Sequence, residues 1–158
     1  MMIRDATPDD AAAICAVLRA SIIDLCAADH RGNPDILARW LANKTPETVA
    51  GWADGQGRSL LVAVGEGTIL GAGGLAHPNE ITLNYVSPQA RFRGVSSALV
   101  AELERRAIAH GAHDIALLST ETAHRFYLAR GYVDVGVPVG KFGTAASYSM
   151  RKTLVRGP

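Results

Sequence analysis

Tyr85-Val86-Ser87-Pro88-Gln89-Ala90-Arg91-Phe92-Arg93-Gly94-Val95-Ser96-Ser97-Ala98-Leu99 carries the chain from a predicted strand, through a basic turn, into a predicted helix. The first N–H groups of a helix have no partner inside the helix, and the helix dipole places partial positive charge there. Gly94 lets the backbone come close to a bound group, and Arg91 and Arg93 add positive charge. The turn therefore predicts an anion site, for which a pyrophosphate is a natural occupant.

The rest of the chain predicts one mixed α/β domain that spans residues 1–158. Its apolar periodicity and turn residues favour helices at residues 7–30, about 34–43, about 46–52, about 94–110 and 120–130. Strands are expected at residues 3–6, 59–64, 69–76, 80–86, 115–118, 132–135 and 145–154. This order predicts a twisted mixed sheet of about six or seven strands with helices on both faces.

The apolar faces of the two longest predicted helices, and one glycine-bearing turn, define how these elements pack. The stripes that should face the core are Ile14, Leu18, Ile22 and Leu25 in the first helix, and Leu99, Val100, Leu103 and Ala107 in the helix after the basic turn. Gly65-Glu66-Gly67 separates two strand-like runs and is typical of a hairpin.

Composition limits the classes of function. The 158 residues are 48% apolar, which favours a compact core, and sixteen Lys and Arg residues nearly balance fifteen Asp and Glu residues. Such a balance gives no reason to expect nucleic-acid or membrane binding through bulk charge. Cys15 and Cys26, eleven residues apart in one predicted helix, would lie about 16 Å from each other, too far for a disulfide. With no apolar run typical of a signal peptide or membrane span, a soluble cytoplasmic protein is expected.

The basic turn resembles the pyrophosphate loop of the GNAT superfamily of N-acyltransferases, whose pattern is Gln/Arg-x-x-Gly-x-Gly/Ala. Arg91, Gly94 and Ser96 stand at the three fixed positions. Ser96 departs from the usual Gly or Ala, although it is the next smallest residue.

A second stretch, Thr120-x-x-Ala123-x-x-Phe126-Tyr127-x-x-x-Gly131-Tyr132, resembles the other GNAT signature, Asn-x-x-Ala-x-x-Phe/Leu-Tyr-x-x-x-Gly-Phe/Tyr. It begins 26 residues after Gly94, with one predicted helix and one strand between them. Thr120 replaces the usual Asn. Ala123 and Tyr127 are one helical turn apart on one face of the predicted helix, so the small side chain leaves room for a ligand beside the phenol.

The resemblance implies an acetyltransferase that passes an acetyl or similar acyl group from acetyl-CoA to an amine, directly and within a ternary complex. No metal is implied. Tyr127 is implied as the general acid that protonates the leaving thiolate, a proton that a phenol can supply. The residues implied to bind acetyl-CoA are Tyr85, Val86, Arg91, Phe92, Arg93, Gly94, Val95, Ser96, Ser97, Thr120, Ala123, Phe126 and Tyr127.

The strand before the loop offers a candidate general base. Alternation predicts that Glu80, Thr82 and Asn84 share one face, opposite a face made by Ile81, Leu83 and Tyr85. The position of Glu80 resembles the general-base glutamate of the histone-acetylating branch of the family. Glu80 or a water is therefore a candidate base, and the alternative is that Glu80 is a solvated charge at the strand edge.

The acceptor is less defined by the sequence. Cys26 and His30, near the end of the first helix, and Thr82 and Asn84, in the strand, are candidate acceptor-pocket residues, with ordinary packing as the alternative for the first two. A small-molecule or peptide amine is expected, without nucleic acid or membrane, and a homodimer is common among similar proteins. Two other functions stay open: an acyl-CoA sensor without catalysis, and a toxin-like acetyltransferase that acts on aminoacyl-tRNA.

Overall fold

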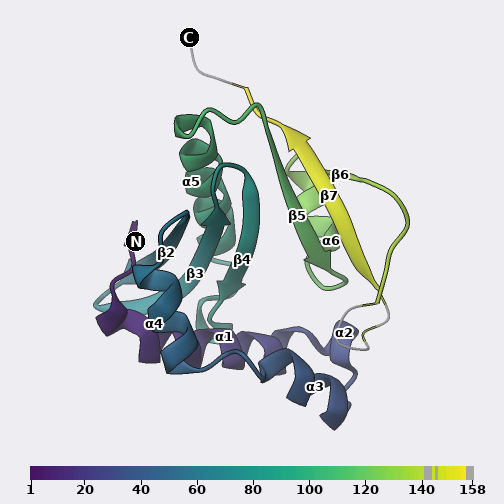
Figure 1. Ribbon diagram of the computed structural model, residues 1–158. Helices are drawn as coiled ribbons and strands as arrows, with labels where there is room; N and C mark the ends of the chain where they lie inside the picture. The colour runs from purple at the N-terminus through teal and green to yellow at the C-terminus, as the bar shows by residue number, and fades with distance from the viewer. Residues whose placement is uncertain (141–143, 145, 156–158) are drawn as a thin grey trace.

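The computed structural model describes residues 1–140, 144 and 146–155, and Figure 1 shows a twisted mixed sheet with helices around it. Seven strands lie in the order β1-β2-β3-β4-β5-β7-β6, which confirms the predicted sheet. The strands are β1 (Met2–Asp5), β2 (Arg58–Gly65), β3 (Thr68–Ala76), β4 (Glu80–Val86), β5 (Asp114–Thr120), β6 (Val133–Asp134) and β7 (Ser147–Thr153). The helices are α1 (Ala11–Leu25), α2 (Ala27–His30), α3 (Pro34–Leu41), α4 (Pro46–Asp54), α5 (Val95–Ala109) and α6 (His124–Ala129), with short 3₁₀ turns at Pro8–Asp10 and Pro88–Ala90.

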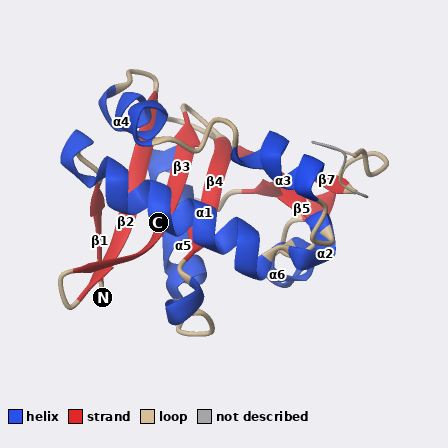
Figure 2. Cartoon of the chain, turned by 90° about the horizontal axis from the view of Figure 1, so that it is seen from below, coloured by secondary structure: helices blue, strands red, loops and turns tan. Residues whose placement is uncertain are grey.

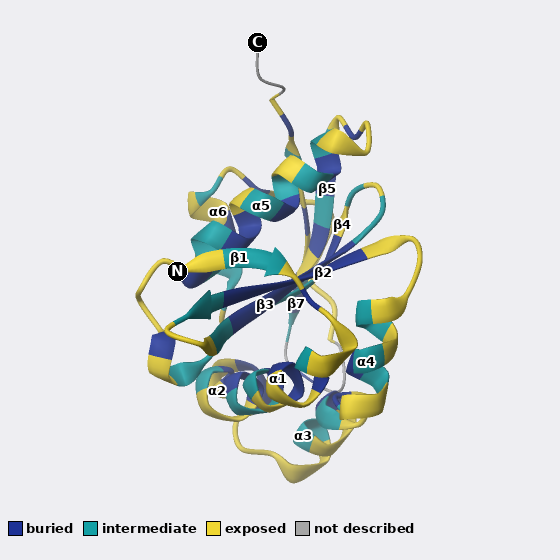
Figure 3. Cartoon of the chain, turned by 90° about the vertical axis from the view of Figure 1, so that its left-hand side faces the viewer, coloured by how far each residue is buried: buried dark blue, intermediate teal, exposed yellow. Residues whose placement is uncertain are grey.

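The helices cover both faces of the sheet (Figure 3). α1 to α4 lie on one face, and α5 and α6 lie on the other; Figure 2 shows α1 running across the strands. Ile14, Leu18 and Ile22 of α1 are fully buried, as the predicted stripe requires, whereas its fourth member, Leu25, is half-buried; Leu99 and Leu103 of α5 are also fully buried. The sheet therefore separates two apolar layers, one under α1 and one under α5.

The β2–β3 hairpin is confirmed, with antiparallel pairing from Arg58 opposite Ala76 to Gly65 opposite Thr68. Glu66 and Gly67 both adopt positive φ at its tip. On β3, Gly71 lets α5 pack directly on the sheet: a Cβ there would come within 2.8 Å of Val95 Cγ1 and of the Tyr85 carbonyl oxygen. The absence of a side chain at Gly71 thus allows α5 to approach β3 closely.

β4 and β5 pair over a short distance and then diverge, which Figure 1 shows as a gap between the two ribbons. They run parallel, and only Glu80 opposite Ala116 and Ile81 opposite Leu117 are in register. β4 therefore has an edge from residue 82 onward that is not paired with any described part of β5. Unpaired strand edges present free N–H and C=O groups, so this edge can bind an extended ligand as an added strand.

Several predicted boundaries differ from the structure, among them those of the first helix, of the helix after β5 and of the last strand. The predicted helix at 7–30 is broken at Cys26, which lies between α1 and α2, whereas Cys15 lies within α1; both are buried free thiols. The helix predicted to begin at Thr120 begins at His124 instead, because Thr120 pairs with Ser147 as the last residue of β5. The last strand was predicted from residue 145, which lies outside the described residues, and β7 begins at Ser147.

None of the helices in the described ranges is both long enough and apolar enough to span a bilayer.

Candidate functional site

The divergence of β4 and β5 opens a cavity of about 540 Å³ that reaches from the β4 edge to the start of α5 and to α6. It gathers residues from both sequence motifs. Those among the predicted coenzyme-binding residues that line it are Tyr85, Val86, Arg91, Phe92, Gly94, Val95, Ser96, Ser97, Thr120, Ala123, Phe126 and Tyr127. Arg93 is the one predicted member that does not line the cavity. Two stretches that are 26 residues apart in the sequence thus contribute to one site.

The loop before α5 has two residues in the left-handed region. Phe92 has φ 64° and Gly94, the N-cap of α5, has φ 78°. The Phe92 ring is 89% exposed, and the Arg91 guanidinium lies over it, 4.5 Å from the ring centroid. A Cβ on Gly94 would meet no atom within 4 Å, so the space in front of this helix end is open. Open amides at the end of a fifteen-residue helix, with Arg91 beside them, form a suitable anion cradle.

Tyr127 is buried in the wall of this cavity, with 5% of its surface exposed. Its ring packs edge-on against Phe126 and Tyr132, and Asn84 Nδ2 donates a hydrogen bond to its Oη at 3.1 Å. Burial raises the pKa of Tyr127 to about 12, although the hydrogen bond from Asn84 and the charge of Arg130 act in the opposite direction. The phenol therefore stays protonated at neutral pH and can serve as a proton donor.

The alternation predicted for β4 is wrong because the strand contains a β-bulge. The register with β3 shifts at Thr82, which has no partner there. An extra residue on one strand exchanges the faces on which the residues before and after it lie. Asn84 therefore reaches Tyr127 on the α6 side, whereas Glu80 lines a second cavity on the side of α1 to α4.

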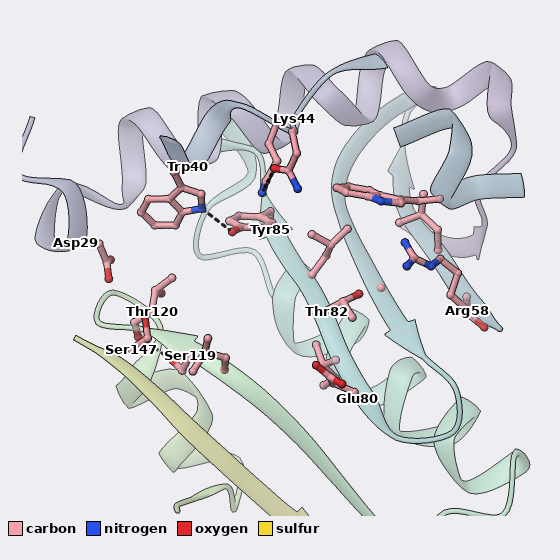
Figure 4. A pocket seen from close by; sticks show the side chains of 18 of the residues that line it. Asp29, Trp40, Lys44, Arg58, Glu80, Thr82, Tyr85, Ser119, Thr120 and Ser147 are labelled. Carbon is pink, nitrogen blue, oxygen red and sulfur yellow. Dashed lines mark hydrogen bonds between the residues drawn. The ribbon is translucent and has the colours of Figure 1, made fainter. Parts of the chain in front are cut away.

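This second cavity has a volume of about 370 Å³ (Figure 4). Trp40, Lys44 and Arg58 line it together with Glu80, and Trp40 Nε1 lies 3.4 Å from Tyr85 Oη. Both cavities share lining residues at the place where β4 and β5 separate, namely Ile81, Thr82, Leu83, Tyr85, Leu118, Ser119 and Thr120. The two cavities therefore meet at the β4–β5 divergence, and the first cavity also reaches Ser21, Leu25 and Cys26 at the end of α1.

Cys26 and His30, the two candidate acceptor residues near the end of the first helix, do not line the same cavity. Cys26 lines the first cavity, and burial raises the pKa of its thiol to about 12. His30 lines neither cavity, because both ring nitrogens are used locally: Nε2 lies 3.0 Å from the Ile22 carbonyl oxygen, and Nδ1 accepts from Gly32 N–H. Within the described ranges, no three His, Cys, Asp or Glu side chains group as a metal site would require.

The sequence did not point to Arg130 as a residue of the site or to the contacts that Asp29 makes. Arg130 lines the first cavity, donates to Ser97 Oγ, and lies 3.7 Å from the centroid of the Phe126 ring. Its spacing of four residues from Phe126 is a signal that could have placed it on the same helix face. Asp29 joins α2 to the turn between β5 and α6, and a contact between residues 92 positions apart leaves no signal in the local sequence.

Asp29→Ala is expected to lower the free energy of unfolding by about 3 kcal/mol, as is usual when buried donors lose a charged partner. The Asp29 side chain accepts from Glu121 N–H at 2.7 Å, Thr122 N–H at 3.1 Å and Thr122 Oγ1 at 2.5 Å. Urea unfolding measures the effect, and exposed Asp24→Ala is the control, with a change below about 0.5 kcal/mol. Equal effects of the two variants would show that Asp29 does not hold this turn.

Comparison with known proteins shows which family this chain belongs to. The model described as Acetyltransferase (GNAT) domain matches residues 30–154. The crystal structure described as a GCN5-related N-acetyltransferase, "Aminotransferase, Class-II", from Rhodopseudomonas palustris is 30% identical, with a TM-score of 0.86 over 97% of this chain and 95% of that chain. No curated protein sequence matches this one.

Two further structures share the fold at lower identity. PaiA N-acetyltransferase from Thermoplasma acidophilum, in complex with coenzyme A, is 16% identical with a TM-score of 0.80, covering 96% of this chain and 98% of that chain. An aminoglycoside 6'-N-acetyltransferase complexed with coenzyme A is 17% identical with a TM-score of 0.72, and the match covers 100% of this chain and 99% of that chain. The match of the family model to most of the sequence, and the likeness in fold over nearly all of it, establish that the chain belongs to the GNAT family of acetyltransferases.

Proposed function

We propose that this protein transfers an acetyl group from acetyl-CoA to an amine, directly and within a ternary complex. The observation that carries the proposal is the cavity at the β4–β5 divergence, where an unpaired strand edge, a helix N-terminus and a buried phenol meet. Each of these serves a different part of one reaction: holding an extended arm, holding phosphate groups, and donating a proton.

The residues present suit coenzyme A. Arg91 and Arg130 line the cavity and complement the negative charge of a pyrophosphate, and the open space in front of Gly94 admits it to the amides of α5. The free edge of β4, which includes Tyr85 and Val86, is suited to hydrogen-bond an amide-containing arm. When bound, acetyl-CoA supplies the thioester that an amine attacks.

Three groups of this chain would act on the reacting atoms. A β4 backbone N–H donates to the carbonyl oxygen on which negative charge develops. Tyr127 Oη gives its proton to the departing sulfur. Glu80, or a water that it holds, accepts the proton that the amine loses; Glu80 lines the second cavity, where the amine would approach from the face opposite Tyr127.

The test measures binding and turnover separately. Calorimetry with coenzyme A should give saturable binding with one site per chain. Acetyl-CoA with a panel of a polyamine, free amino acids, an aminoglycoside and a peptide N-terminus should then release free thiol with at least one amine. Lack of coenzyme A binding would refute the proposal, and binding without thiol release from any amine would favour a sensor.

A further inference from the structure

The side chain of Asn84 has one satisfied and one unsatisfied end. Its Nδ2 donates to Tyr127 Oη at 3.1 Å. Its Oδ1 is buried, and among the described residues it is the one buried side-chain nitrogen or oxygen that lacks a hydrogen-bond partner. A buried polar atom without a partner is costly and uncommon in folded proteins, so such an atom at a cavity calls for an explanation.

The surroundings of Asn84 indicate that a ligand supplies the missing donor. Asn84 lines the first cavity, on the stretch of β4 that β5 leaves unpaired. Across that gap Ser119 also lines the cavity, but its hydroxyl already donates to the Thr120 carbonyl oxygen at 2.8 Å. The bulge at Thr82 turns Asn84 toward this cavity and not toward the second one.

The hydrogen bond also fixes where the proton of Tyr127 can point. A phenol oxygen has one O–H to donate and accepts through its lone pairs. Since the Asn84 amide N–H is directed at Oη, the phenol cannot direct its own proton at that nitrogen. The tyrosine O–H is thereby free to point elsewhere, including into the cavity that Tyr127 lines.

We propose that Asn84 is a positioning residue of this acetyltransferase: its amide N–H holds the Tyr127 phenol with its proton directed into the cavity, and its Oδ1 accepts an N–H of a bound substrate. The N–H belongs either to the amide arm of coenzyme A or to the acceptor amine. The inference rests on the proposed function for the identity of the substrates, whereas the contact between Asn84 and Tyr127 exists in the free protein.

The first test needs no substrate. Fluorine NMR of protein labelled with 3-fluorotyrosine reports the surroundings of the Tyr127 phenol, whose signal is identified by its loss in Tyr127→Phe. Asn84→Ala should shift this signal at neutral pH, because the amide that donates to the Tyr127 oxygen is removed. Asn79→Ala is the matched control and should leave the signal in place, since Asn79 precedes β4 and donates to Asp114 Oδ1 away from both cavities. An unchanged Tyr127 signal in Asn84→Ala would overturn the positioning role.

The second test measures the coupling of the two side chains in turnover. Asn84→Ala should lower kcat about tenfold, the effect of one hydrogen bond, and should cause little further loss in a Tyr127→Phe background. Asn84→Asp keeps an acceptor oxygen but has no N–H to donate, so it should retain substrate affinity and lose the kcat contribution. Fully additive losses in the double variant would contradict action through Tyr127.

The same variants identify the N–H donor. If coenzyme A supplies it, its Kd from calorimetry rises in Asn84→Ala about tenfold; if the acceptor supplies it, that Kd is unchanged and the KM of the best amine of the panel rises. Unchanged Kd and KM would refute the role of Oδ1. Wild-type protein that fails to bind coenzyme A would instead refute the proposed function, leaving the NMR test of the Asn84–Tyr127 contact intact.

Discussion

Tyr127→Phe is expected to lower kcat about 100-fold or more, the usual contribution of a general acid, while the Kd for coenzyme A changes less than about threefold. The phenol is buried and its pKa is raised to about 12, so it is a neutral proton donor over the whole range in which an amine acceptor can be assayed. Removing one oxygen leaves the ring packed against Phe126 and Tyr132. An assay of thiol release gives kcat, and calorimetry gives the affinity for coenzyme A.

The control for this variant is Tyr148→Phe, which removes a phenol that donates to Glu121 Oε2 and lies outside the lining of both cavities. It should leave kcat within about twofold of wild type. Unchanged turnover in Tyr127→Phe would exclude this residue as the acid. A parallel fall in kcat and in coenzyme A affinity would indicate that the oxygen shapes the cavity instead.

Gly94→Val is expected to weaken coenzyme A binding about 100-fold. A β-branched residue at φ 78° is strained by about 1–3 kcal/mol, and relief of that strain turns the first amides of α5 away from the anion cradle. The expected loss is a consequence of backbone conformation and of the added isopropyl group in the cradle, because a Cβ at this position meets no protein atom within 4 Å. Calorimetry with coenzyme A measures it.

Gly67→Val is a matched control. Like Gly94, Gly67 has a positive φ, of 75°, and a Cβ there would meet no atom within 4 Å, but it lies in the β2–β3 turn. It should lose a similar amount of folding stability and bind coenzyme A normally. If both variants bind equally well, the loop before α5 is not where the phosphates are held. If both fail, the defect is one of folding.

The local elements of this protein were largely readable from its sequence. The apolar stripes of the two long helices and the glycine hairpin are local patterns of period 3.6 and 2, and they act through neighbours in the chain. The strand–turn–helix around Gly94 is equally local, since a helix N-terminus and a left-handed residue are both defined within a few positions. Family membership followed from the same short stretches.

The predicted polar row on β4 failed for a reason that no local pattern contains. A bulge depends on how two strands register, and it is the pairing of β4 with β3 that leaves Thr82 without a partner. Glu80 and Asn84 therefore came to lie on opposite faces. The ring nitrogens of His30 likewise find their partners at the Ile22 carbonyl of α1 and the Gly32 N–H of the turn after α2, contacts that fit the packing alternative.

By itself, the sequence determined most of the elements, the basic turn that leads into α5 and the tyrosine-bearing helix, because each is specified by side chains a few residues apart. Only the tertiary structure decided that β4 and β5 part after two residue pairs, that two cavities meet there, and that Asn84 contacts Tyr127 across 43 residues. Those features depend on contacts between distant segments, whose geometry is fixed by packing over the whole sheet and not by the residues on either side in the chain.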